Sequence, residues 1–391
     1  MKKITRLLGV FALVLCVILL TCENSDKDDP YIDLFPISAM DLVADMGIGW
    51  NLGNTFDAVS GGLSTPIDTL ESAWCGIVTK EANIQAIYDA GFRTVRIPVS
   101  WKKAADPNNN YAIRDDWMMR ITQVVDWAIN RGMYVIINTH HDSGYDHGPI
   151  FSCQPSAVDQ SLVRFKQIWK QIAENFKWYD EKLIFEPLNE PRSTSSWTGT
   201  AEQWANLNKH YQVFVDTVRA TGENNRSRFL LFNTYAASRS SGPMNALELP
   251  KDPAKGKHIA GYHAYVPDTF AFGGIPGTPR GDTVIWNEAI SGSSVTAPMH
   301  DFYNKFVSQG IPVIIGETGA TNKNNESERA AWAEFYVKSA KEMGMCVIVW
   351  DNNNFTIPAS GDNNELFGLL NRSTSKIAYP LYMEGLLKGL E

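Results

Sequence analysis

The feature that most constrains the fold is a regular alternation of short apolar runs with longer amphipathic segments. Eight such runs are rich in Leu and β-branched residues and do not alternate in polarity. Strands that are buried on both faces, as in parallel sheets, have this pattern. The predicted strands are 47–52, 94–99, 134–139, 182–188, 228–233, 258–264, 312–317 and 346–351.

The segments between these runs predict helices. In 117–130, Ile121, Val125 and Ile129 recur at helical spacing, and Gly132 follows the end, where a left-handed backbone is commonly needed. The segment 236–257 has little helical signal. The predicted helices are 83–90, 117–130, 157–176, 202–220, 299–308, 327–343 and 378–387.

Repeated strand–helix units over 36–391 predict an α/β fold, a (β/α)8 TIM barrel that forms a single catalytic domain. The alternative is an open doubly wound sheet, which would carry a glycine-rich phosphate turn after its first strand. Here Gly53-Asn54-Thr55-Phe56-Asp57 follows that strand, without a GxGxxG or P-loop pattern. We therefore favour the barrel over the open sheet.

The N-terminus has the features of an export signal. Lys2, Lys3 and Arg6 precede the apolar stretch 7–20, and Leu-Thr-Cys22 resembles a bacterial lipobox. We predict a lipoprotein-type signal peptide over 1–21 and a polar tether over 22–35 that begins at a lipidated Cys22. The alternative is an ordinary secretory signal. The protein is then expected to be exported, lipid-anchored at the bacterial cell surface or outer membrane, or otherwise secreted.

Charge and hydropathy limit the kinds of partner that this chain can bind. A formal charge of −8 disfavours nucleic acid. No other apolar stretch is long enough to span a membrane, so membrane association is expected only through Cys22. We expect a monomer. Cys75 and Cys153 lie in loops of an exported chain, where either a disulfide or two unpaired thiols is consistent with the sequence.

Polar residues gather where the predicted strands end. In a TIM barrel the carboxyl ends of the strands form the face that carries the active site. One polar strand end is common, but polar ends on six strands indicate a functional site. The residues in question are Arg96, Trp101, His140, His141, Asn189, Glu190, His263, Tyr265, Glu317 and Trp350.

Glu190 and Glu317 follow the fourth and seventh predicted strands. A retaining glycosidase needs two carboxyl groups about 5–5.5 Å apart, one protonated acid and one ionised nucleophile. Arg96 and Tyr265 are candidate partners for the ionised one. Asn189 is placed to bind a sugar hydroxyl, and Trp350 offers a flat face for a sugar ring. The alternative, two structural ion pairs, is disfavoured because both carboxylates occur on one rim.

The remaining candidate residues have structural interpretations. His140 and His141 are neighbours at a strand end, and neighbouring strand residues point to opposite faces, so a catalytic metal is disfavoured. No metal and no cofactor are expected. Glu186 is interpreted as structural. Pro187 lies inside a predicted strand, where it would require a bulge. Besides Trp350, the rim candidates for a sugar subsite are Trp74, Trp101, Trp197 and Trp286.

The strand-end segments, taken together and in order, resemble glycoside hydrolase family 5. The matching motifs are Gly49-Trp50-Asn51-Leu52-Gly53-Asn54-Thr55, Thr94-Val95-Arg96-Ile97-Pro98-Val99, Ile137-Asn138-Thr139-His140-His141, Leu188-Asn189-Glu190-Pro191, His263-Ala264-Tyr265 and Ile315-Gly316-Glu317-Thr318-Gly319. The resemblance is closest to the branch of endo-β-1,4-glucanases that includes xyloglucanases and lichenases.

The resemblance implies that Glu190 is the general acid/base and Glu317 the nucleophile. It implies supporting or sugar-contacting roles for Arg96, His140, His141, Asn189, His263, Tyr265 and Trp350. The expected function is retaining, endo-acting hydrolysis of β-1,4-glucan backbones such as cellulose, xyloglucan or mixed-linkage glucan. The alternatives are an endo-β-mannanase on the same scaffold and a non-catalytic glycan-binding barrel.

Overall fold

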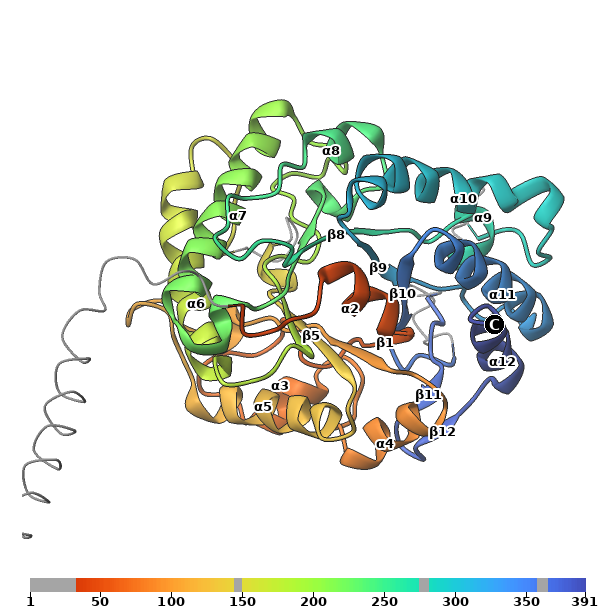
Figure 1. Cartoon of the computed structure of the whole chain (residues 1–391). Helices are drawn as coiled ribbons and strands as arrows, with labels where there is room; N and C mark the ends of the chain where they lie inside the picture. The colour runs from red at the N-terminus through yellow and green to blue at the C-terminus, as the bar shows by residue number, and fades with distance from the viewer. Residues whose placement is uncertain (1–32, 144–149, 274–280, 357–364) are drawn as a thin grey trace, which may run out of the picture. The chain divides into compact units, whose positions relative to one another are not determined.

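Eight parallel strands close into a barrel in the order β1-β10-β9-β8-β7-β6-β5-β2, with β1 also paired to β2 (Figure 1). The computed structural model describes residues 33–143, 150–273, 281–356 and 365–391. The predicted signal peptide 1–21 and most of the tether 22–35 lie outside the described residues. The barrel prediction is confirmed, and the open sheet is excluded. The strands are β1 (Ile48–Leu52), β2 (Thr94–Ile97), β5 (Tyr134–Asn138), β6 (Leu183–Glu186), β7 (Leu230–Asn233), β8 (His258–His263), β9 (Val313–Thr318) and β10 (Met345–Asp351).

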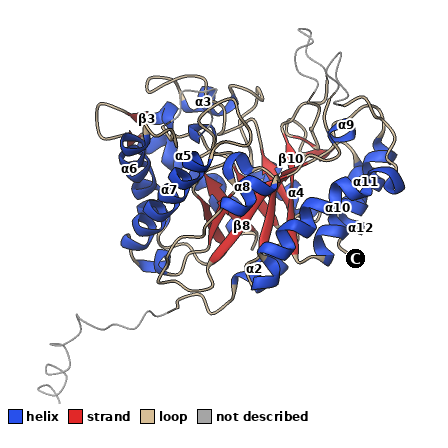
Figure 2. Cartoon of the chain, turned by 90° about the horizontal axis from the view of Figure 1, so that it is seen from above, coloured by secondary structure: helices blue, strands red, loops and turns tan. Residues whose placement is uncertain are grey.

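Helices surround the strands (Figure 2). The predicted helices correspond to α4 (Glu81–Asp89), α5 (Asp115–Ile129), α6 (Val158–Phe176), α7 (Ala201–Ala220), α10 (Glu288–Lys305), α11 (Glu326–Glu342) and α12 (Pro380–Lys388). Shorter elements were not predicted: α2 (Ala39–Asp45), α3 (Ile67–Ser72), α8 (Ser241–Ala246), α9 (Asp268–Ala271) and the hairpins β3 (Ala105–Asp106) with β4 (Ala112–Ile113) and β11 (Leu370–Asn371) with β12 (Lys376–Ile377). None of the helices in the described ranges is long and apolar enough to span a membrane.

Helix α10 begins at Glu288, well before the predicted start at 299. Its first half is rich in Ser and contains Gly292 and Pro298, residues that read as a loop. The side chain of Asn287 nevertheless accepts a hydrogen bond from the Ile290 N–H and caps the helix. The cap and the burial of Val295 and Met299 outweigh the low helix propensity.

Helix α2 closes the amino-terminal mouth of the barrel (Figure 1). Leu42, Val43 and Met46 of this segment belong to one buried cluster with residues from the first half of the strands, among them Ile136 and Phe229. A larger cluster fills the layer between the strands and the surrounding helices. With one mouth closed by apolar side chains, a ligand has access only from the carboxyl ends of the strands.

Two details of the strands correct or sharpen the predictions. Strand β6 ends at Glu186, so Pro187 lies beyond the ladder and no bulge is needed there. Strand β9 carries the irregularity instead, because its register shifts against β8 and places His263 opposite Glu317. A Cβ atom on Gly316 would lie 3.0 Å from Nε2 of His263, so a larger residue there would press against the ring of His263.

The possible disulfide is not formed. Cys75, Cys153 and Cys346 are all free thiols. Cys153 is buried and its sulfur lies 3.0 Å from the hydroxyl of Ser193, whereas the Cys75 thiol donates to the carbonyl of Ile77. The two thiols therefore have separate local partners.

Candidate active site

A cleft of about 1200 Å³ lies at the carboxyl ends of the strands. Its walls contain most of the predicted site residues: His140, His141, Asn189, Glu190, His263, Tyr265, Glu317 and Trp350. These side chains come from the ends of five strands that are far apart in the sequence. Five of the six polar strand ends therefore meet in one cleft, whereas Arg96 and Trp101 at the end of β2 are buried and do not line it.

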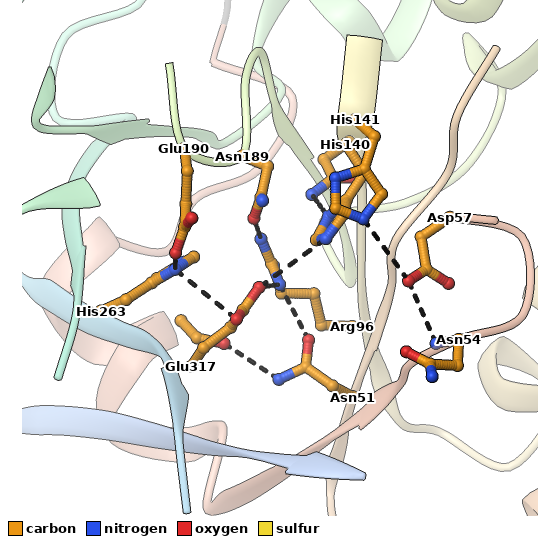
Figure 3. Close-up of polar contacts among 12 residues, drawn as sticks. Asn51, Asn54, Asp57, Arg96, His140, His141, Asn189, Glu190, His263 and Glu317 are labelled. Atoms are coloured by element: carbon orange, nitrogen blue, oxygen red, sulfur yellow. Dashed lines mark hydrogen bonds and ion pairs between the residues drawn. The ribbon is translucent and has the colours of Figure 1, made fainter. Parts of the chain in front are cut away.

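The two carboxylates meet through His263 (Figure 3). Nδ1 of His263 lies 2.9 Å from Oε1 of Glu190 and 3.7 Å from Oε2 of Glu317. One carboxylate oxygen of Glu190 and one of Glu317 lie within 4.8 Å of each other. This separation agrees with the spacing of about 5–5.5 Å in retaining glycosidases and leaves too little room for the water that an inverting enzyme places between its carboxyl groups.

The surroundings of the two carboxylates differ. Glu317 has 8% of its side chain exposed and accepts hydrogen bonds from Arg96 (2.8 Å) and from the hydroxyl of Tyr265 (2.9 Å). Burial and the charges of Glu317 and Glu190 raise the pKa of Tyr265 well above its usual value, so the phenol keeps its proton and donates it. Glu190 has 27% of its side chain exposed. Glu317 is thus the more enclosed carboxylate, with two hydrogen-bond donors, and Glu190 is the more open to the cleft.

Arg96 lies beneath the cleft rather than in its wall. It is fully buried, and its guanidinium donates to both oxygens of Glu186 (2.7 and 2.8 Å) as well as to Glu317. Burial alone lowers the pKa of Arg96, but the charges and hydrogen bonds of Glu186 and Glu317 outweigh burial and raise it. Arg96 was predicted as a partner of the ionised carboxylate, which the contact with Glu317 agrees with, and also among the supporting or substrate-binding residues. The structure makes it a positioning residue and confirms the structural interpretation of Glu186.

Three asparagines that received no role from the sequence support this site. Asn51 accepts from Arg96 and donates to the carbonyl of Gly316 (3.0 Å), and Asn138 donates to Glu186 (3.3 Å). Asn233 donates to Glu186 (2.6 Å) and to the carbonyl of Asn189 (2.8 Å). All three lie on strands of the barrel, a position that was visible in the sequence, but neutral amides carried no distinguishing signal.

The two histidines behave differently from the prediction. Strand β5 ends at Asn138 and His141 begins a 3-10 turn, so the alternation of strand residues no longer applies, and both side chains line the cleft. Their ring centroids are 4.6 Å apart, and His140 stacks on Trp350 at 5.9 Å. The prediction that the two side chains point to opposite faces is therefore wrong.

Two groups of residues in the described ranges have ligand atoms at metal-like spacing: Asp57 with His140 and His141, and Glu190 with His263 and Glu317. Asp57 is buried, and burial raises its pKa to about 6 despite hydrogen bonds from the backbone N–H groups of Thr55 and Asn54. Its carboxylate lies 4.0 Å from Nε2 of His141. The second group is the carboxylate pair itself with its bridging histidine.

The rim tryptophans separate into two kinds. Trp74 and Trp197 line the cleft together with Trp350. Trp101 is fully buried and donates to the carbonyl of Asn138, while Trp286 packs against Phe270 and Phe335. Trp101 and Trp286 are therefore structural.

The family model for cellulases, glycosyl hydrolase family 5, matches residues 54–356. The chain belongs to glycosyl hydrolase family 5. It is a glycoside hydrolase of the endoglucanase type, and members of this family retain the anomeric configuration of the sugar. The mutual position of Glu190 and Glu317 is what such a reaction requires.

Individual relatives agree with this assignment. The chain is 40% identical over 367 residues to Endoglucanase B of Neocallimastix patriciarum, covering 90% of this chain and 72% of the relative. A broad specificity endoglucanase from Ruminococcus champanellensis, solved with bound cellotriose, has a TM-score of 0.82 and 39% identity, covering 90% of this chain and 99% of that chain. A family 5 lichenase from Caldicellulosiruptor sp. F32 has a TM-score of 0.84 and 38% identity, covering 94% of this chain and 99% of that chain.

Proposed function

We propose that this hydrolase cuts β-1,4-glucan chains internally, with Glu317 as nucleophile and Glu190 as general acid/base. The observation that carries the proposal is the separation of the two carboxylates, since one oxygen of each lies within 4.8 Å of the other, combined with their unequal surroundings. Arg96 and Tyr265 hold Glu317 as a charged acceptor. Glu190, more exposed, is available to the leaving group.

The reaction proceeds in two displacements. An oxygen of Glu317 attacks the anomeric carbon while the glycosidic C–O bond breaks, and protonated Glu190 gives its proton to the departing oxygen. The sugar is then bonded to Glu317 as a glycosyl ester. Glu190, now ionised, takes a proton from water, whose oxygen attacks the same carbon and releases Glu317. The configuration is inverted twice and so retained.

Asn189 has a defined role in this scheme. Its side-chain oxygen accepts a hydrogen bond of 2.6 Å from Arg96, which fixes the amide and leaves the NH₂ group as the donor available to a ligand. Asn189 lines the cleft next to Glu190. We assign it to the 2-hydroxyl of the reacting sugar, where hydrogen bonds strengthen in the transition state. His140, His141 and Trp350 line the same part of the cleft and are assigned to sugar contacts.

Azide rescue distinguishes the two carboxylates. Glu317→Ala is expected to lose nearly all turnover, and azide should then form a glycosyl azide of inverted configuration. Glu190→Ala with an activated aryl glycoside should give the azide of retained configuration. Glu186→Gln, which alters a buried carboxylate beneath the cleft, is the matched control and should show no rescue. Full hydrolysis by Glu317→Ala or Glu190→Ala would exclude these roles.

The choice among glucans is proposed from the relatives. Two of them are named endoglucanases and one a lichenase, which supports a β-glucan backbone over mannan. Initial rates on carboxymethyl-cellulose, mixed-linkage glucan, xyloglucan and mannan test this choice. A highest specificity constant on mannan would favour the mannanase alternative. Binding without hydrolysis of any of the four would revive the non-catalytic alternative.

We also propose that the protein is exported as a lipid-anchored monomer. The support is the basic and apolar N-terminal sequence that ends at Cys22. Wild type should partition with membranes and incorporate labelled fatty acid, and Cys22→Ala should do neither. Light scattering of detergent-solubilised protein measures the oligomeric state. Wild type that remains soluble and unlabelled would contradict the anchor.

A further inference from the structure

The hairpin near the C-terminus carries a buried arginine that joins two segments of the cleft rim. Arg372 directly follows strand β11 and is fully buried. Its Nη1 donates to the carbonyl of Gly53 (2.8 Å) and to the hydroxyl of Thr55 (2.7 Å), and its Nη2 donates to the carbonyl of Asp351 (2.7 Å). Gly53 and Thr55 follow β1, and Asp351 ends β10. One guanidinium therefore connects the carboxyl ends of two neighbouring strands.

The counter-charge of Arg372 is the carboxylate of Asp351, which is also buried. Oδ1 of Asp351 lies 3.7 Å from Nη2 of Arg372. Oδ2 accepts hydrogen bonds from the indole N–H of Trp50 and from the backbone N–H of Leu370, both at 2.8 Å. The guanidinium carbon lies 5.4 Å from the centroid of the Trp50 ring. A buried charge is tolerated when it is paired and hydrogen-bonded, and Asp351 together with the carbonyl acceptors meets this requirement for Arg372.

The hairpin that carries Arg372 is itself fixed to helix α4 (Figure 1). The side chain of Asn83 in α4 donates to the carbonyl of Arg372 (2.9 Å) and to the hydroxyl of Ser375 (2.9 Å). The backbone N–H of Arg372 donates to the side chain of Asn353 (3.2 Å), in the loop after β10. The backbone of Arg372 is therefore held on both sides, and its guanidinium starts from a fixed point.

The two segments that Arg372 connects carry side chains of the cleft wall. Asn54 and Asp57 line the cleft from the turn after β1, and Trp350 lines it from β10. Asp57 accepts hydrogen bonds from two backbone N–H groups of this turn (2.6 and 3.0 Å), so the turn and the Asp57 carboxylate move together. A Cβ atom on Gly53 would lie 2.6 Å from the Trp350 ring, so the two segments are in close contact. Arg372 holds both segments, although it does not itself line the cleft.

The position of the turn relative to the carboxylates decides which part of the substrate it meets. Figure 3 places Glu317 between Glu190 on one side and Asn54 with Asp57 on the other. Glu190 is assigned to the leaving group. The glucose units on the side of Asn54 therefore belong to the portion of the chain that bonds to Glu317.

We propose that Arg372 is a positioning residue that fixes the rim of the cleft around the glucose units that bond to Glu317. Its acceptors lie on two separate segments. A planar guanidinium presents several N–H groups in a rigid fork and serves both segments at once, whereas the ammonium of a lysine is a single flexible point charge. This inference rests on the proposed function, because Glu190 as the acid defines the two sides of the cleft.

The test varies the number of glucose units on that side alone. Dinitrophenyl glycosides of glucose, cellobiose and cellotriose share one leaving group, which needs no proton from Glu190. In wild type, kcat/KM should rise as glucose units are added. A misplacement of about 1 Å can cost roughly a hundredfold, and a rim that shifts but keeps its side chains should cost less, so Arg372→Met should reduce this gain by about threefold to tenfold. The change should appear mainly as a higher KM on the longer glycosides, because the rim binds sugar and does not react.

Two milder variants keep the proposal testable, since replacement of a buried arginine also lowers the melting temperature. Thr55→Val removes one acceptor of Arg372 but keeps the shape of the side chain and the backbone N–H. It should show the same dependence on glycoside length to a smaller extent. Arg372→Lys should recover part of the gain that Arg372→Met loses.

Arg228→Met is the matched control. Arg228 is equally buried and donates to backbone carbonyls, among them that of Leu183 (2.9 Å). It comes just before β7, at the mouth of the barrel opposite the cleft. Arg228→Met should lower the melting temperature and leave the dependence on glycoside length as in wild type.

Equal losses on all three glycosides in the folded Arg372 and Thr55 variants would overturn the positioning role while leaving the hydrolase assignment intact. A wild-type rate that does not rise with glycoside length, or the same loss of this rise in Arg228→Met, would overturn it too. A wild-type protein that hydrolyses none of the three glycosides would instead overturn the proposed function, and the role of Arg372 with it.

Discussion

His263 joins the two carboxylates of the cleft: its Nδ1 lies 2.9 Å from Oε1 of Glu190 and 3.7 Å from Oε2 of Glu317. Its other ring nitrogen, Nε2, is buried and has no hydrogen-bond partner among the described residues. Leaving a buried ring N–H without an acceptor costs more free energy than leaving a ring nitrogen lone pair without a donor. The neutral tautomer with no proton on Nε2 is therefore favoured. We infer that the proton is on Nδ1 and that His263 donates it to Glu190.

Replacing His263 should therefore impair proton donation. A hydrogen bond to a charged group contributes about 1.5–3 kcal/mol, which corresponds to a loss in kcat of roughly tenfold to a hundredfold for His263→Ala. The loss should be large for cello-oligosaccharides and much smaller for a dinitrophenyl glycoside, whose leaving group needs no proton. Equal losses on both substrates would contradict this role of His263.

Arg96 should contribute to stability as well as to activity. In Arg96→Met, two buried carboxylates lose their cation, and removal of one partner of a buried pair costs about 3–5 kcal/mol. Denaturant unfolding measures the loss. Adding Glu186→Gln to this variant removes one unpaired charge and should restore part of the stability without restoring turnover. An unchanged midpoint in Arg96→Met would show that the pairing is energetically neutral.

His210 should make the fold sensitive to mild acid. Burial lowers the pKa of His210 to about 4. The hydrogen bond with the carbonyl of Asn206 acts in the opposite direction, and the charge of Lys209 lowers the pKa further. The unfolded chain, with a pKa near 6.5, binds the proton first, so stability is lost as the pH falls from about 6.5 toward 4. His210 alone accounts for about 2 kcal/mol of the difference between pH 7 and pH 5.

His210→Gln should flatten this dependence in denaturant titrations at the two pH values. His300→Gln, which replaces an exposed helix histidine, is the matched control and should keep the wild-type dependence. An unaltered slope in His210→Gln would refute the assignment.

The free thiols predict a specific labelling pattern. Cys75 is partly exposed, whereas burial raises the pKa of Cys153 to about 11 and that of Cys346 to about 12. A thiol reagent applied to native protein should label Cys75 and spare Cys153 and Cys346, as mapped by mass spectrometry. Reductant should not change the melting temperature. A reductant-dependent melting temperature that disappears in Cys75→Ser would instead reveal a bridge.

The barrel could be predicted because each of its strands is a continuous apolar run, and burial on both faces leaves that mark in local sequence. Helix α2 and the first half of α10 could not, since α2 is a single short element and α10 begins in residues of low helix propensity. Their formation depends on packing against strands that are remote in the chain.

The carboxylate pair could be named from motif order together with Arg96 and Tyr265 as partners of the ionised one, but the contacts that hold these partners in place could not. Arg96 is held beneath the cleft by its two hydrogen bonds to Glu186. His141 lines the cleft because the strand before it ends at Asn138. Asn51 and Asn233 act through contacts across the barrel that no local pattern records.

Helix α2, which closes the amino-terminal mouth of the barrel, has a consequence for how the enzyme meets its polymer. The chain enters the barrel domain next to this helix, on the side opposite the cleft. A long polymer must therefore approach the face that lies away from the first residues of the barrel domain, and those residues do not obstruct it.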